Sequence, residues 1–115
     1  MSWYPVCPFV RLPVDRAVCV LVRGEQVALV RTLEDRLYAV DNQDPLTGAM
    51  VLSRGIVGSR GDRDVLVSPL HKQAYLLESG ECLDLPDAWL RVHDVRVVAG
   101  AVEVRLAAES ERVPA

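Results

Sequence analysis

The side chains best suited to chemistry lie in two short polar segments of the chain. Residues 42–49, NQDPLTGA, contain Asp44, and residues 68–72, SPLHK, contain Ser68 and His71. An aspartate, a serine and a histidine can act as a metal ligand, a nucleophile and a base. However, Ser68 lacks the G-x-S-x-G setting of a nucleophile elbow, and one imidazole falls short of the ligands that even zinc requires. The two segments therefore favour neither a hydrolase nor a metal site.

Asp44 and the second histidine of the chain both favour structural roles. Asp44 stands before Pro45 and ahead of Gly48, where a carboxylate commonly accepts hydrogen bonds from the amides of its own loop. A catalytic or metal-binding carboxylate is the alternative for this residue. His93 follows Val92 in an apolar stretch, so we predict a neutral histidine at the edge of a core.

Length and composition indicate one ordinary globular domain. The 115 residues can bury a core without disulfides or metals, and 50% of them are hydrophobic and 25% charged. The net charge of −3 offers no basic stripe for nucleic acid. The first residues show no signal sequence, and no stretch approaches the roughly 20 apolar residues of a membrane span. We expect a cytoplasmic protein that binds neither nucleic acid nor membranes.

The cysteine pattern agrees with that location. Cys7, Cys19 and Cys82 match neither a C-x-x-C motif nor a disulfide framework. Cys19 lies inside the apolar run of residues 17–22, so we predict that it is a buried, reduced thiol. Reduced cysteines are typical of the cytoplasm.

Short Val-rich runs separated by Gly, Asp and Pro predict strands joined by turns. Gly24 and Gly100 supply the turns of two hairpins. In the last run, Val102 and Val104 alternate with Glu103 and Arg105, which is the period of a strand with one buried face. The fold class predicted is all-β, a small sandwich or barrel. Its strands are expected at residues 17–22, 26–31, 37–41, 64–67, 73–77, 92–98 and 101–106.

Residues 43–63 interrupt this pattern, because Pro45 and four glycines break any regular element. A loop of this length inside a compact domain usually has a function. We expect at most one helical turn in it, over residues 49–53. The tail of residues 107–115, AAESERVPA, is small and charged and is expected to fray.

The order of strands and loops over residues 5–106 resembles a Rieske domain, an all-β fold whose two loops each contribute one Cys and one His to a [2Fe–2S] cluster. In this resemblance Asp44 and Leu46 occupy the ligand positions of the first loop, and Ser68 and His71 those of the second. His71 alone is a residue of the required type. The resemblance therefore implies a single Rieske-like domain with two degenerate cluster-binding loops and no cofactor of its own.

A narrower resemblance is carried by residues 52–58, LSRGIVG, and residues 68–73, SPLHKQ. Together they are similar to the small subunit of the assimilatory NAD(P)H-dependent nitrite reductases. This resemblance implies a non-catalytic subunit that docks on a large subunit carrying FAD, sirohaem and a [4Fe–4S] cluster, where nitrite is reduced to ammonium. The chain itself has no G-x-G-x-x-G motif for a dinucleotide and no set of cysteines for a cluster.

The arginine- and glycine-containing segment of residues 54–63 has two interpretations. It can be a solvated loop, or it can dock the large subunit, because arginines and exposed apolar side chains are common in interfaces. Ile56 and Val57 are expected at the tip of this loop. His71 can contact the large subunit, brace the two loops through a hydrogen bond, or simply pack at a loop tip. The docking residues predicted are Arg54, Ile56, Val57, Arg60, His71 and Lys72.

Two other functions compete with this interpretation. A free electron carrier of the Rieske ferredoxin kind would need Cys or His at Asp44, Leu46 and Ser68. A small-molecule binding protein could reuse the emptied cluster pocket, although Leu46 and Leu70 are expected to fill it. Stabilisation by a small ligand would indicate a binding protein, whereas stabilisation by the partner alone would indicate a docking module.

Overall fold

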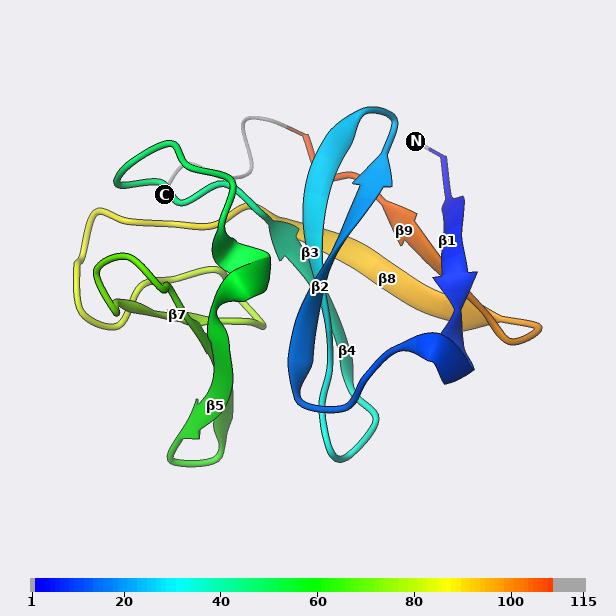
Figure 1. The fold of residues 1–115 in the computed structure, drawn as a ribbon, viewed down its shortest axis with the longest axis horizontal. Helices are drawn as coiled ribbons and strands as arrows, with labels where there is room; N and C mark the ends of the chain where they lie inside the picture. The colour runs from blue at the N-terminus through cyan, green and yellow to red at the C-terminus, as the bar shows by residue number, and fades with distance from the viewer. Residues whose placement is uncertain (1, 109–115) are drawn as a thin grey trace.

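Residues 2–108, which the computed structural model describes, form an all-β fold of nine strands and two short 3-10 turns (Figure 1). The all-β prediction is confirmed. No helix among these residues is long and apolar enough to cross a membrane. In chain order the elements are β1 (Tyr4–Pro8), η1 (Phe9–Arg11), β2 (Arg16–Val22), β3 (Glu25–Arg31), β4 (Leu37–Asp41), η2 (Leu52–Arg54), β5 (Ile56–Arg60), β6 (Arg63–Val67), β7 (Ala74–Leu76), β8 (Val92–Val98) and β9 (Ala101–Arg105).

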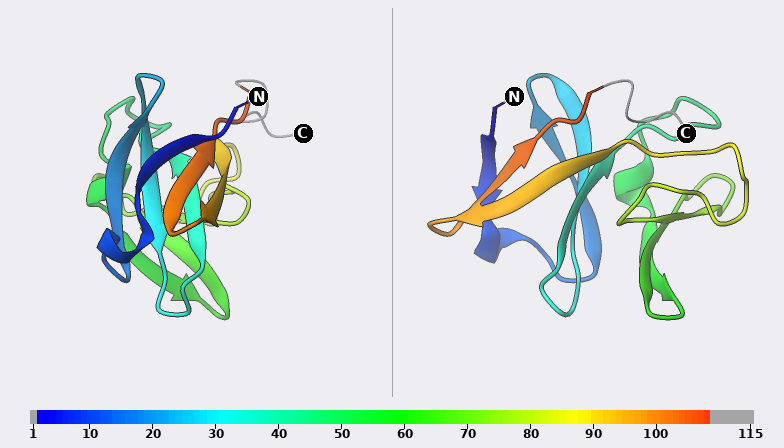
Figure 2. Two further views of the ribbon diagram at one scale, coloured as in Figure 1. Left: turned by 90° about the vertical axis from the view of Figure 1, so that its right-hand side faces the viewer. Right: turned by 180° about the vertical axis from the view of Figure 1, so that it is seen from behind.

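The strands form two antiparallel sheets that lie side by side (Figures 1 and 2). The larger sheet has the order β1-β9-β8-β4-β3-β2 and curls until its two edge strands, β1 and β2, approach each other. The smaller sheet has the order β5-β6-β7, and its strand β5 lies near β2. The larger sheet is therefore a nearly closed barrel, in agreement with the predicted class.

Two-residue turns close the hairpins at the predicted glycines. Arg23 and Gly24 join β2 to β3 with φ angles of 51° and 80°, and Ala99 and Gly100 join β8 to β9 with 49° and 81°. Positive φ at both turn residues matches the right-handed twist of the strands. Every strand predicted from the sequence is present, with its ends shifted by at most one residue.

Strand β3 joins two hydrophobic cores because it is buried on both faces. Val27 and Leu29 point into the curled sheet, whereas Ala28 and Val30 point into a core shared with the smaller sheet. This arrangement fixes the two sheets against each other. The shared core also contains side chains from both sheets and their connecting loops, namely Val40, Leu52, Leu66, Tyr75, Leu77 and Leu90.

Residues 43–63 are not one loop, contrary to the prediction. Both η2 and β5 lie within this segment, and η2 overlaps the helical turn expected at residues 49–53. Ile56 and Val57 therefore begin a strand, and the tip of its hairpin is at Gly61. Glycine is tolerated in β5 because the strand lies at the edge of its sheet.

Two further differences concern edge strands. β1 was not predicted, since Pro5 and Pro8 lower strand propensity, yet proline is tolerated at a sheet edge. Cys19 is exposed, so the prediction of a buried thiol is wrong. It lies on β2, the other edge of the sheet, with its Sγ 3.7 Å from Asn42 Nδ2. An apolar run on an edge strand is therefore not buried on both faces.

The predicted tail of residues 107–115 is described only at its start, and residues 109–115 lie outside the described residues. The N–H of Ala107 donates to Nδ1 of His93 at 3.0 Å, and its carbonyl oxygen accepts from Arg91 Nη1 at 3.3 Å. Ala107 is thus held by side chains at the start of β8. His93 is buried, near the core as predicted.

Replacing Gly80 with alanine is expected to lower the free energy of unfolding by about 2 kcal/mol and Tm by about 8 °C. Gly80 has a φ of 82°, and a Cβ there would overlap the carbonyl oxygen of Leu90. Thermal unfolding followed by circular dichroism measures the change. Gly58→Ala is the matched control, because a Cβ at Gly58 meets no atom within 4 Å and its φ is not positive. Equal melting of both variants would contradict the prediction.

Candidate functional site

The two predicted loops lie at one end of the smaller sheet, and each is closed by hydrogen bonds between its own backbone groups. In the first, Asp44 N–H donates to Ala49 O and Gly48 N–H donates to Asp44 O, both at 2.8 Å. In the second, Ser68 N–H donates to Gln73 O at 3.0 Å. These bonds give both loops a fixed shape before any side chain is considered.

A hydrogen bond between side chains ties the two loops together. Ser68 Oγ donates to Asp44 Oδ2 at 2.6 Å, and both side chains are buried. The N–H of Leu46 donates to Asp44 Oδ1 at 2.8 Å, and the N–H of Leu70 donates to Ser68 Oγ at 3.3 Å. The two positions that the resemblance aligns with cysteine ligands are therefore bonded directly to each other.

Gln73 and Tyr75 extend this network into the core. Gln73 Nε2 lies 3.3 Å from Asp44 Oδ2 and donates to the Tyr75 hydroxyl oxygen at 3.0 Å. Burial raises the pKa of Tyr75 to about 12, with the hydrogen bond from Gln73 opposing this rise and the Asp44 charge adding to it. Tyr75 thus stays a neutral phenol. The sequence analysis did not name these two residues as site residues, although a glutamine directly before a buried apolar strand is a signal for a buried polar contact.

The leucines and the histidine of the loops lie nearer the surface. Leu46 and Leu70 were expected to fill a pocket between the loops. They are instead 45% and 46% exposed, so that prediction is wrong. The buried side chains of Asp44, Ser68 and Gln73 occupy that position instead. The side chain of His71 is exposed and forms no hydrogen bond within the described part of the chain, so the bracing contact is made by Asp44 and Ser68.

These residues do not fit a [2Fe–2S] cluster. A Rieske cluster takes two thiolates and two imidazoles, whereas the aligned positions hold a carboxylate, an aliphatic chain, a hydroxyl and one imidazole. Within the described residues, no group of three His, Cys, Asp or Glu side chains could hold a metal ion. The aligned positions therefore lack the ligand set of a Rieske cluster.

A second buried network anchors the strand that leads into the first loop. Asp41 Oδ1 accepts from Arg91 Nε at 3.1 Å and lies 3.0 Å from His93 Nε2. Since His93 Nδ1 accepts the N–H of Ala107, Nε2 carries the ring proton and donates to Asp41. Arg91 also forms an ion pair with Glu25.

Opposing effects set the pKa of Asp41. Burial alone would raise it, but the hydrogen bond from His93 and the charge of Arg91 outweigh burial and lower it below its ordinary value. Asp41 directly precedes Asn42, whose Oδ1 accepts the N–H of Ser53 at 2.7 Å. The base of the first loop is therefore fixed by charged and neutral hydrogen bonds.

The predicted docking residues lie on two neighbouring segments. Ile56 pairs with Val67, which precedes Ser68, so the start of β5 adjoins the second loop. Ile56 is 70% exposed, whereas Val57 is half-buried against the shared core. Arg54, His71 and Lys72 are exposed near this end, and Arg60 is exposed at the far end of β5, in an ion pair with Asp84 at 3.5 Å.

Comparison with known proteins agrees with this geometry. Residues 2–105 match the Rieske-like [2Fe-2S] domain family. The chain is 35% identical over 105 residues to the nitrite reductase (NADH) small subunit of Salmonella typhimurium, a match that covers 90% of this chain and 97% of the relative. The chain belongs to the nitrite reductase small-subunit family. This membership confirms the resemblance inferred from the two loop segments.

Other members and neighbours of the nitrite reductase family support the assignment. A crystal structure described as an NADH-dependent nitrite reductase small subunit of Mycobacterium tuberculosis superposes with a TM-score of 0.88 at 44% identity, covering 93% of this chain and 97% of that one. The chain is also 34% identical over 102 residues to the nitrite reductase [NAD(P)H] large subunit of Klebsiella oxytoca, covering 89% of this chain but 11% of that protein. A domain of this family thus also occurs inside a much longer polypeptide.

Proposed function

We propose that this chain is the non-catalytic small subunit of an NAD(P)H-dependent nitrite reductase and acts by docking on the large subunit. The observation that carries the proposal is the Asp44–Ser68 hydrogen bond, which joins two positions that the resemblance to Rieske domains equates with cluster ligands. A Rieske-like fold whose loops are closed by side-chain hydrogen bonds is suited to contact, since these loops offer no electron-carrying group.

The Klebsiella oxytoca relative supports the choice of partner. In that protein a domain 34% identical to this chain belongs to the polypeptide of a large subunit. Covalent linkage of two modules in one organism is the arrangement expected when separate chains form a complex in another. We further propose that the large subunit carries FAD, sirohaem and a [4Fe–4S] cluster and reduces nitrite to ammonium, and that the complex is cytoplasmic.

The proposed docking surface retains the six residues named from the sequence. Exposure supports this choice for most of them, whereas Val57 contributes mainly to the core. Nucleic acid and membranes are not proposed as partners. The surface consists of Arg54, Ile56, Val57, Arg60, His71 and Lys72.

A titration tests the function. NAD(P)H-dependent nitrite consumption by the cognate large subunit is measured as this purified chain is added, alongside an iron assay of the chain alone. Turnover is expected to rise and saturate at a fixed ratio, with no iron in this chain. No complex and no change in turnover would overturn the proposal, and bound iron would overturn the non-redox role.

Ile56→Asp is expected to weaken the complex at least about tenfold while leaving the domain folded, because this side chain is 70% exposed in the isolated chain. Isothermal titration calorimetry with the large subunit measures the affinity. Val10→Asp is the matched control: Val10 is 84% exposed and lies on η1, away from β5 (Figure 1). Unchanged affinity of the Ile56 variant would remove Ile56 from the docking surface.

A further inference from the structure

The outer edge of β5 has no strand partner within residues 2–108. β5 is the first strand in the order β5-β6-β7, and its ladder runs from Ile56 opposite Val67 to Arg60 opposite Arg63. The N–H of Leu77 donates to the carbonyl oxygen of Asp64, so the backbone of Asp64 faces β7. Every second residue of an antiparallel strand bonds the same neighbour.

This alternation of backbone hydrogen bonds identifies the N–H and C=O groups of β5 that do not bond β6. Ser59 lies opposite Asp64, and Val57 lies opposite Leu66. Because Asp64 and Leu66 direct their backbone groups toward β7, Ser59 and Val57 direct their N–H and C=O groups away from β6. Unpaired edges of this kind are places where another extended segment can add.

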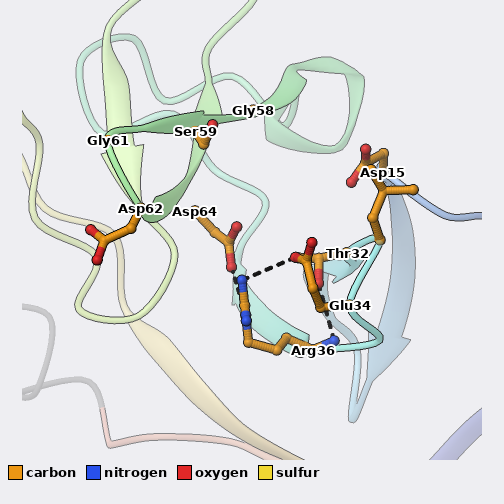
Figure 3. Close-up of a pocket in the computed structure, with 10 residues that line it drawn as sticks. Asp15, Thr32, Glu34, Arg36, Gly58, Ser59, Gly61, Asp62 and Asp64 are labelled. Carbon is orange, nitrogen blue, oxygen red and sulfur yellow. Dashed lines mark hydrogen bonds and ion pairs between the residues drawn. The ribbon is translucent and has the colours of Figure 1, made fainter.

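Two hollows that share Asp15 lie beside this free edge, and together they are called the groove here. Its other wall is formed by the start of β2 and by the turn between β3 and β4. One hollow of about 450 Å³ is lined by Arg16, Ala17, Arg54, Ile56 and Val57. The next, of about 290 Å³, is lined by Asp15, Thr32, Glu34, Gly58 and Ser59 (Figure 3). Asp15 lines both hollows. Figure 3 shows Gly58, Ser59 and Gly61 on one wall and Asp15 and Thr32 across from them.

The two ends of the groove carry opposite charge. Arg16 and Arg54 are exposed at one end, and neither has an ion pair among the described residues. The lining of the other end contains the acidic residues Asp15, Glu34, Asp62 and Asp64 and one arginine, Arg36, which pairs with Glu34 and Asp64 at 3.1 Å each. An occupant with one acidic and one basic end matches this pattern.

We propose that an extended segment of the large subunit adds to β5 as a fourth strand of the smaller sheet. Backbone hydrogen bonds to Val57 and Ser59 supply the affinity, and the charged ends of the groove set the direction of the segment. The acidic end of the segment lies against Arg16 and Arg54, and its basic end lies against Asp62 and neighbouring carboxylates. This inference rests on the proposed function and names the surface and the mode of docking.

Ser59→Pro tests the strand addition directly. The substitution removes the outward N–H and places a ring in the groove, and it leaves the β5–β6 ladder intact because that N–H does not bond β6. The Kd for the purified large subunit is expected to rise at least about tenfold. A thermal melt of the isolated variant checks that it is folded.

Charge reversal at Arg54 is a second test of the proposal. It remains informative even if the Ser59→Pro variant fails to fold. Arg54→Glu is expected to raise the Kd about tenfold at low ionic strength and less in high salt, because exposed charges are screened. Arg11→Glu makes the same charge change on η1 and is expected to bind like the wild type. The Arg54 variant retains the backbone of β5.

The outcomes separate this inference from the proposed function. No binding by the wild-type chain overturns the proposed function as a docking subunit. Wild-type binding that is unaffected by both Ser59→Pro and Arg54→Glu overturns strand addition and leaves the proposed docking function in place. Selective weakening of both variants supports strand addition.

Discussion

Asp44→Ala is expected to lower the free energy of unfolding by about 3–5 kcal/mol, a large part of the about 5–15 kcal/mol that holds a domain together. The substitution removes the acceptor of three donors: the buried Ser68 hydroxyl, the Leu46 N–H and the buried Gln73 amide, which keeps only its bond to Tyr75. Each unpaired buried group costs about 1–3 kcal/mol, and the bond between the loops is lost as well. Tm is expected to fall by about 12–20 °C.

Urea denaturation followed by tryptophan fluorescence and circular dichroism measures this change. Asp87→Ala is the matched control, because Asp87 is exposed and forms no side-chain hydrogen bond among the described residues. Asp44→Asn keeps the shape of the side chain and is expected to lose less than Asp44→Ala. A loss below about 1 kcal/mol for Asp44→Ala would show that the loops hold together without this contact.

Asp44 and Ser68 also show where sequence reasoning stops. The resemblance to Rieske domains placed them at equivalent positions of two loops, and the local pattern around Pro45 indicated that Asp44 bonds the amides of its loop, as it does with Leu46. Their direct contact, however, joins residues 24 positions apart. That distance is set by the packing of the smaller sheet, which no local pattern describes.

The strands likewise fall into two groups, those that local sequence signals predict and those that they do not. Hairpins with Gly24 and Gly100 in their turns were predictable, because the turn residues and the apolar period are both local signals. β1 and β5 were missed, because an edge strand tolerates the prolines and glycines that normally end a strand. Cys19 was misplaced for a related reason, since an edge strand can expose part of an apolar run. The errors of the sequence-based prediction thus concentrate at sheet edges. The proposed docking surface on β5 is also a sheet edge.

Asp41→Asn is expected to lower the free energy of unfolding at pH 7 by about 3 kcal/mol. The carboxylate of Asp41 partners the buried Arg91 and receives a hydrogen bond from His93, so the variant leaves a buried guanidinium with only part of its compensating charge. Asp94→Asn is the control, because Asp94 forms an exposed ion pair with Arg105, which contributes at most about 1 kcal/mol.

The pH dependence gives this prediction a second signature. Because the pKa of Asp41 is lowered in the fold, its contribution is fully present above the unfolded value of about 3.9 and is lost as pH falls through the folded pKa. Wild-type stability is therefore expected to fall below about pH 4, whereas Asp41→Asn starts lower and changes less over that range. Urea denaturation at pH 7, 5, 4 and 3 measures both curves. Parallel curves for wild type and variant would mean that Asp41 titrates alike in the folded and unfolded chains. The first loop would then depend on Asn42 and on the Asp44–Ser68 bond, and not on the charged network at its base.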